Sequence, residues 1–220
     1  MIILQKTGGI AATNAFLVAE EKTGQAVLFD APDHTVGPLL DEAGRRNWDI
    51  IGLWLTHGHF DHIADHAKVI SRFPQAKVLI HVLDEPKLQE PNSSFFELPF
   101  TIPPRQADEK VAEGQKLQLG SLQCEVIHTP GHSPGHVMYH FPEQRILIGG
   151  DLIIGGSVGR TDLPDSNHAQ LNASIRRIMQ LPGDTRLFPG HGRPSSLADE
   201  RRNNPYVRLA LGEENDAFAE

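Results

Sequence analysis

The sequence lacks a second cysteine, because Cys124 is the single one among its 220 residues. A lone cysteine excludes any disulfide within the chain, which agrees with a reducing compartment. No apolar run approaches the roughly 20 residues that a membrane span needs. The N-terminus, MIILQKTGGI, has no basic region followed by an apolar stretch of signal-peptide length. We therefore expect a cytoplasmic protein that is not inserted in a membrane, with Cys124 as a small buried hydrophobe.

Positive charge is also scarce. The chain has 20 Lys and Arg against 28 Asp and Glu, which gives a formal net charge of -8. A surface of this charge repels polyphosphate, so the composition disfavours nucleic-acid partners. The length suits one domain with a substantial core, and neither a composition break nor an internal repeat marks a boundary. We expect a single domain over residues 1–220, with a short C-terminal tail from about residue 195.

Short apolar runs alternate with turn signals along most of the chain, which is typical of strands. The runs lie at 1–5, 14–20, 25–30, 50–57, 77–83, 116–129, 135–141, 144–151 and 185–190. Apolar residues at helical spacing predict helices over 35–47, 62–73 and 167–181, with Thr35 as the N-cap of the first, and the tail from Ser195 also looks helical. Two strand-rich sections, each followed by helices, predict two sheets packed face to face with helices outside.

Residues 84–113 interrupt this rhythm. Five prolines punctuate the segment and Phe95, Phe96 and Phe100 are interspersed, so we predict an irregular insertion. Two roles are open for it. It caps a groove over a functional site, or it covers the edge of the sandwich or forms a dimer contact, and the second role is slightly favoured.

One short segment carries an unusual density of metal-ligand side chains. THGHFDHIAD, residues 56–65, holds His57, His59, Asp61 and His62 directly after an apolar run. Imidazole and carboxylate are ligands that suit zinc, iron or manganese. His57 and His59 can project to one side of a loop while Asp61 and His62 open the next helix. The spacing therefore indicates two adjacent metal positions.

Further ligand candidates lie in Gly- or Pro-rich turns after apolar runs, where a sheet presents functional groups. They are His132 in HTPGHSPGH, Asp151 in LIGGD and His191 in FPGHG. With the four residues of the dense segment they make seven candidates, a number that favours a binuclear site bridged by Asp151.

The other histidines are interpreted as structural or surface residues. His34, His81, His128, His140 and His168 have no such context, and His136 is assigned a structural role. His66, one helical turn after His62, is expected on a solvated helix face rather than behind a ligand.

The motif His57-x-His59-x-Asp61-His62, followed by His132, Asp151 and His191, resembles the ligand pattern of the metallo-β-lactamase fold. Within that fold the chain is similar to the glyoxalase II group, short bacterial type, through TPGHSPGH, GGD, GRTDLP and FPGHG. The resemblance runs from about residue 12 to about residue 205. It implies a four-layer αββα sandwich with two metal ions at one edge, of which zinc is the first choice and iron or manganese the alternatives.

The resemblance also assigns a role to each candidate. It implies that His57, His59 and His132 hold one metal, that Asp61, His62 and His191 hold the other, and that Asp151 bridges the two. Asp30 in LFDAP matches an aspartate that orients a ligand histidine through its second ring nitrogen, although a turn-forming role has comparable weight. Arg160 in GRTDLP matches a basic residue that binds a glutathione carboxylate, although an ion pair with Asp162 is an equal alternative.

The implied activity is hydrolysis of a thioester such as S-D-lactoylglutathione by hydroxide generated between the metals, with Asp61 accepting a proton. Asp162 stands where glyoxalase II enzymes have tyrosine, and their C-terminal helical region is missing or reduced to residues 195–220. The main alternative is a persulfide dioxygenase with one iron on His57, His132 and Asp151, and lactone or ester hydrolysis is a further one. The expected partner is a small molecule, and the chain is expected to be a monomer or a homodimer.

Overall fold

A mixed β-sheet forms the N-terminal half of the fold in the computed structural model, which describes residues 1–93 and 97–213. Its order is β1-β2-β3-β4-β5-β6, antiparallel from β1 to β3 and parallel from β3 to β6. The strands are β1 (Ile2–Gly8), β2 (Thr13–Glu20), β3 (Gln25–Phe29), β4 (Asp49–Trp54), β5 (Lys77–His81) and β6 (Glu109–Val111).

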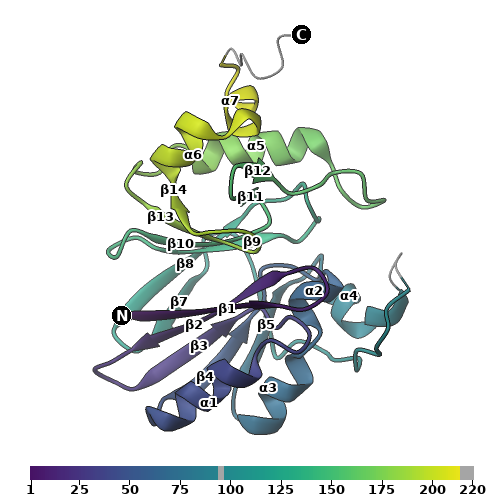
Figure 1. The fold of residues 1–220 in the computed structure, drawn as a ribbon, viewed down its shortest axis with the longest axis vertical. Coiled ribbons are helices and arrows are strands. Elements are labelled where there is room, and N and C mark those ends of the chain that lie inside the picture. Colours follow the sequence, from purple (N-terminus) through teal and green to yellow (C-terminus); the bar gives the residue numbers. More distant parts are fainter. Residues whose placement is uncertain (94–96, 214–220) are drawn as a thin grey trace.

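A second mixed sheet follows along the chain and lies against the first (Figure 1). Its order is β14-β13-β10-β9-β8-β7, in which β10 and β13 are parallel and the other neighbours antiparallel. The strands are β7 (Lys116–Leu119), β8 (Leu122–His128), β9 (Val137–Phe141), β10 (Ile146–Gly150), β13 (Arg186–Pro189) and β14 (Ser195–Ser196). A small hairpin of β11 (Ile153–Ile154) and β12 (Ser157–Val158) follows β10.

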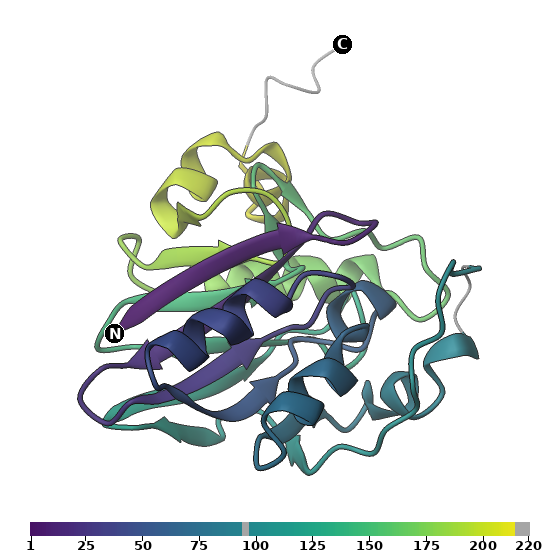
Figure 2. The ribbon, with the colours of Figure 1, turned by 60° about the horizontal axis from the view of Figure 1, so that its bottom comes forward.

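Helices cover the outer face of each sheet, so the molecule has four layers (Figures 1 and 2). On the first sheet they are α1 (Gly37–Arg45), α2 (Phe60–Ile63), α3 (His66–Arg72) and α4 (Glu85–Gln89), with a 3-10 turn at Pro91–Ser93. On the second they are α5 (His168–Ile178), α6 (Leu197–Asn203) and α7 (Pro205–Ala210). None of the helices in the described residues has the length and apolar character that crossing a bilayer requires.

Strand β2 shows how the sequence specifies these layers. It is buried along its whole length, and successive side chains point to opposite faces. Phe16 and Val18 belong to the apolar cluster between the two sheets, whereas Leu17 and Ala19 belong to the cluster beneath α1 and α3. A third cluster lies between the second sheet and α5–α7. Both sheets are thus covered on both faces, which confirms the predicted αββα sandwich.

Two details of the predicted helices are wrong. Thr35 does not cap α1, because Val36 holds the N-cap position and the Thr35 hydroxyl donates to the Asp33 carbonyl at 2.9 Å. The helix expected over 62–73 is split into α2 and α3, because the Asp65 amide donates to the Ala31 carbonyl at 2.7 Å. That bond crosses to the end of β3 and takes the place of the helical bond that would join the two pieces.

The other helix predictions hold. In α5 the Asn167 side chain accepts from the Gln170 amide, and Leu171, Ile175 and Ile178 are buried as the spacing predicts. The tail from residue 195 is helical through α6 and α7, and its residues 214–220 lie outside the described residues. Cys124 is fully buried, as expected.

The segment 84–113 is more ordered than predicted. It contains α4 and the 3-10 turn, and it ends in β6, which pairs in parallel with β5. Ile102 is buried in the first core cluster, and Phe100 packs against it. Phe95 and Phe96 lie outside the described residues.

Candidate metal centre

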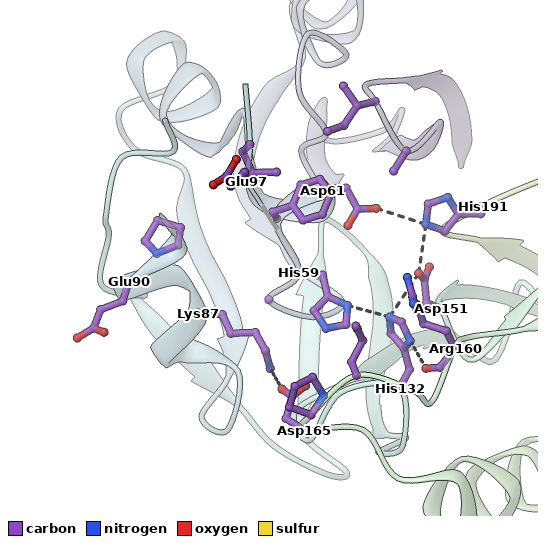
Figure 3. Close-up of a pocket in the computed structure, with 18 residues that line it drawn as sticks. His59, Asp61, Lys87, Glu90, Glu97, His132, Asp151, Arg160, Asp165 and His191 are labelled. Carbon is purple, nitrogen blue, oxygen red and sulfur yellow. Dashed lines mark hydrogen bonds and ion pairs between the residues drawn. The ribbon is translucent and has the colours of Figure 1, made fainter. Parts of the chain in front are cut away.

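The seven predicted ligands lie together at one edge of the sandwich, although they come from both sheets. His57 and His59 follow β4, and Asp61 and His62 lie in α2, the helix that follows directly. The remaining three, His132, Asp151 and His191, follow β8, β10 and β13. These strands all deliver their carboxyl ends to this edge, so residues far apart in sequence meet there (Figure 3).

Three groups of side chains in the described residues could each hold a metal ion. In each group the ligand atoms all lie within 4.8 Å of one another; the groups are His57, His59 and His132; His57, His62 and Asp151; and Asp61, His62 and His191. The first and third groups share no residue, and the second group links them.

Direct distances show how close the two groups are. The His59 Nδ1 atom lies 2.9 Å from His132 Nε2 in the first group. Asp151 Oδ2 lies 3.5 Å from His132 Nε2 and 3.2 Å from His191 Nε2, so this carboxylate reaches both groups. A single carboxylate between two sets of ligands is the position that a bridging residue needs.

Buried polar atoms test whether the residues fit a metal. His57 Nε2, His62 Nε2 and Asp151 Oδ1 are buried and make no hydrogen bond within the described residues. A buried polar atom without a partner costs about 1–3 kcal/mol, and such atoms are rare in folded proteins. Three of them at one place, all on nitrogen or carboxylate oxygen, match the donors that Zn²⁺ or Fe²⁺ accepts. The residues therefore fit the metal that the motif predicts.

The carboxylates of the centre are held in the ionised form. Burial acts to raise the pKa of Asp151, but the neighbouring His62 and His191 outweigh it and hold the pKa well below its ordinary value. In the same way burial opposes the fall of the Asp61 pKa, and His62 and His191 lower it to about 2. Two buried negative charges supply the attraction that a divalent cation needs.

The histidines divide by their surroundings. Burial, followed by the neighbouring His62 and His59, lowers the pKa of His57 well below its ordinary value, which keeps its ring neutral as metal binding requires. Burial also acts to lower the pKa of His191, but contacts with Asp151 and Asp61 outweigh it and raise the pKa to about 10.

Asp30 contacts His62, one of the candidate ligands. Its Oδ2 atom is 2.8 Å from His62 Nδ1 and leaves the other ring nitrogen of His62 facing Asp61 and Asp151. The Thr56 amide and hydroxyl each donate to the Asp30 carboxylate at 2.8 Å. Such a contact fixes the tautomer and direction of a ligand histidine.

A cavity of about 580 Å³ opens beside the centre. His59, Asp61, His132, Asp151 and His191 line its inner end. Lys87, Glu90, Pro91, Glu97 and Leu98, which belong to the segment 84–113, line another part. Part of the segment 84–113 therefore lines the cavity, which the slightly favoured prediction of an edge cover or dimer contact did not include.

The family follows from these features together with a direct comparison. The sequence profile of the metallo-beta-lactamase superfamily matches residues 8–191, most of the chain. The chain belongs to the metallo-beta-lactamase superfamily.

Individual members of the superfamily resemble the chain over most of its length. The structure of BLEG-1 B3 metallo-beta-lactamase has a TM-score of 0.86 at 32% identity, covering 94% of this chain and 99% of that one. The structure of TTHA1623 in a di-iron-bound form has a TM-score of 0.82 at 35% identity, covering 94% and 100%. A hydroxyacylglutathione hydrolase of Maricaulis maris is 31% identical over 176 residues, covering 80% of this chain and 60% of the relative. With the ligand cluster, these likenesses identify the chain as a metallo-hydrolase of the superfamily.

Arg160 makes two contacts in this chain, one through its side chain and one through its backbone. Its guanidinium forms a bidentate pair with the Asp162 carboxylate at 2.6 and 2.7 Å, the alternative that the sequence left open. Its main-chain carbonyl lies 2.9 Å from His132 Nδ1, so the Arg160 backbone orients a predicted ligand. The side chain also lines the cavity. The backbone contact was not predictable from the sequence.

Asp84 is a buried residue of the centre that the sequence analysis missed. Its carboxylate accepts from the Gly58 amide at 2.8 Å and from the Ser133 hydroxyl and the Gly135 amide at 2.7 Å each. It thereby ties the loop that carries His57 and His59 to the loop that carries His132. The sequence feature that could have identified Asp84 is its position shortly after β5, at the same sheet edge as the candidate ligands.

Thr13 and Asn14 were also missed. The Thr13 hydroxyl donates to Asp61 Oδ2 at 2.6 Å. The Asn14 side chain donates to the carbonyls of Pro189 and Gly192 at 2.9 Å each, which braces the turn that holds His191. Neither residue stands out in the sequence, because both read as the start of a strand.

The histidines interpreted as structural or surface residues lie outside the three groups. His136 has the predicted structural role, since its Nε2 accepts from the Asp151 amide at 2.8 Å. His66 corrects a prediction. It is buried rather than on a solvated face, and its Nδ1 contacts the Ile63 carbonyl at 2.9 Å.

Proposed function

We propose that the chain is a binuclear metallo-hydrolase that cleaves a thioester. In this proposal His57, His59 and His132 hold one divalent ion, and Asp61, His62 and His191 hold a second, with Asp151 between them. Zinc is the first choice, and iron and manganese are the alternatives. The observation that carries the proposal is the pair of complete ligand groups joined by Asp151, because a mononuclear reaction would need only one of them.

Bound divalent ions would supply two kinds of chemistry, a lowered pKa for water and stabilisation of negative charge on a carbonyl oxygen. The chain itself prepares the surroundings. Asp61 lines the cavity, and Thr13 fixes its Oδ2 atom, so we assign Asp61 as the acceptor of a proton from the attacking water. The Asp30 carboxylate orients the His62 ring, and the Arg160 carbonyl orients the His132 ring.

The leaving group explains the choice of a thioester. A thiol has a pKa near 8.5, so a thiolate departs without a strong general acid. In the described lining of the cavity, Lys87 is held by carboxylates and the histidines belong to the ligand groups. A substrate that needs no protonation suits such a site.

The test combines metal content with activity. The purified chain is analysed for each element, stripped by a chelator and reloaded with zinc, iron or manganese, and each form is assayed with S-D-lactoylglutathione and with a neutral acyl thioester. Two metals per chain and hydrolysis that chelation abolishes would support the proposal. One iron per chain, with oxygen consumed on glutathione persulfide and no thioester cleaved, would overturn it in favour of the dioxygenase. Full activity after exhaustive chelation would overturn both.

A further inference from the structure

The outer part of the cavity differs from its metal-facing end. Ile10, Phe60, Leu98 and Leu163 contribute apolar surface to its lining. Ile10, in the turn between β1 and β2, is 58% exposed and lies in the lining of the cavity. An exposed apolar residue at the mouth of a cavity gains by covering an apolar ligand, since contact removes both surfaces from water.

The basic side chains in the described lining of the cavity are already engaged. They are Lys87 and Arg160. The Lys87 ammonium lies 2.6 Å from Asp165 Oδ2 and 3.2 Å from Asp84 Oδ1. Arg160 is held by both oxygens of Asp162. A carboxylate on a ligand would have to displace one of these partners before it met a cation.

Acidic side chains line the same outer part. Glu90 and Glu97 lie on the side of the cavity away from Asp151 and His191 (Figure 3). Glu97 is exposed, so its charge faces the solvent through which a ligand enters. The outer cavity therefore offers apolar surface and the exposed negative charge of Glu97, while its two basic side chains, Lys87 and Arg160, are already paired.

We infer that the cavity selects acyl substrates whose leaving group is apolar and neutral or cationic, and that it disfavours leaving groups that carry carboxylates, such as glutathione. The inference rests on the proposed function, which it narrows. A glutathione thioester brings two carboxylates to the outer part of the cavity, away from the candidate metal positions, where the Glu97 charge repels them. Neither Lys87 nor Arg160 is free there to offset that repulsion.

Binding tests the inference without requiring turnover. The probes are two thioethers with the same S-butyl group, S-butyl-N-acetylcysteamine, which is neutral, and S-butylglutathione, which is anionic. Calorimetry with the metal-loaded chain should give a Kd about tenfold lower for the neutral probe, and added salt should narrow the ratio because it screens exposed charges. Equal binding, or tighter binding of S-butylglutathione, would overturn the inference.

A charge reversal localises the effect. Glu97→Lys should shift the ratio of the two Kd values about tenfold toward S-butylglutathione. Glu143→Lys is the matched control, because Glu143 is exposed in the turn before β10, at the opposite end of that strand from Asp151. It changes the net charge equally and should leave the ratio unchanged. The same shift in both variants would assign the effect to overall charge and overturn the inference.

Hydrolysis of the corresponding S-butyryl thioesters separates the two proposals. Cleavage of the neutral thioester with the larger kcat/KM supports both. A larger kcat/KM for the glutathione thioester would support the proposed function and overturn the inference. When neither is cleaved, the proposed function fails, and the binding ratio still decides whether the cavity discriminates by charge.

Discussion

The two sheets contribute to the metal centre in different ways. The first sheet supplies four predicted ligands from one segment, His57 to His62, which leaves β4 and turns at once into α2. The second sheet supplies three, one each after β8, β10 and β13. In the first case chain connectivity keeps the ligands near one another, whereas in the second only the pairing of the strands does.

The support behind the ligands differs accordingly. On the first sheet side chains do the bracing, through Asp30 and Thr56 behind His62 and through Asp84 beneath Gly58. On the second sheet part of the support comes from the backbone, since the Arg160 carbonyl contacts His132 Nδ1 and a Cβ atom at Gly190 would collide with Asp151 Oδ1. The side chains of Asn14 and Asp84 reach its loops from the first sheet. The dispersed ligands therefore depend on contacts between the sheets as well as on local side chains.

Removing one ligand from each sheet tests whether the two groups act separately. His59→Ala should deplete the first metal and His191→Ala the second, each lowering kcat/KM on the order of 10³-fold because the proposed mechanism uses both ions to activate water. Metal stoichiometry measured beside activity distinguishes the sites. His168→Ala, at an exposed histidine outside the groups, is the control and should change neither. Loss of both metals from both variants would show that the sheets form one indivisible site.

Removing the supports should have a smaller effect. Asp84→Asn weakens the link between the loops of His57 and His132, and Asp30→Asn removes the acceptor behind His62. We expect each to weaken metal affinity about 10–100-fold, the first variant at the His57 group and the second at the His62 group. Competition with a chelator measures both affinities. Unchanged affinity at the His57 group in Asp84→Asn would mean that Asp84 only stabilises the fold.

Asp84 also gives a prediction about pH. Burial acts to raise its pKa, but Lys87 and the hydrogen bonds from Ser133, Gly58 and Gly135 outweigh it, so the pKa lies below the ordinary value of 3.8. A lowered pKa in the folded state stabilises the protein above the unfolded value, and this contribution is lost as pH falls through the folded value. Urea unfolding of the metal-free chain should therefore lose less stability between about pH 5 and pH 3 in Asp84→Asn than in the unmodified chain. Equal losses would contradict the assignment.

The contrast between the sheets also explains how much the sequence could predict. Four ligands within six positions exceed chance clustering, so the residues alone indicated the centre on the first sheet. His132, Asp151 and His191 each had only a turn after an apolar run, and the pattern of a known fold was needed to join them. The layers were predictable because alternating strands such as β2 specify both of their faces.

What the sequence could not predict depends on contacts between distant segments. Asp84 accepts hydrogen bonds from Gly58, 26 positions earlier in the chain, and from Ser133 and Gly135, which are 49 and 51 positions later. Asn14 donates to carbonyls that are 175 and 178 positions later. The break between α2 and α3 has the same origin, a bond from Asp65 to Ala31 that no helical pattern reveals. His66 was misplaced because that break changes which side of the segment faces the core.

The smallest effect is expected at Arg160, where the second sheet's support comes from the backbone rather than the side chain. Arg160→Ala removes an exposed ion pair with Asp162, and exposed pairs are worth about 0–1 kcal/mol, so the free energy of unfolding should change by no more than that. The carbonyl that contacts His132 Nδ1 remains, so metal content should not change. Because the guanidinium is already paired, KM for S-D-lactoylglutathione should change by less than about threefold, as initial-rate kinetics would show. A tenfold rise in KM with kcat unchanged would instead mean that Arg160 leaves Asp162 to bind a substrate carboxylate.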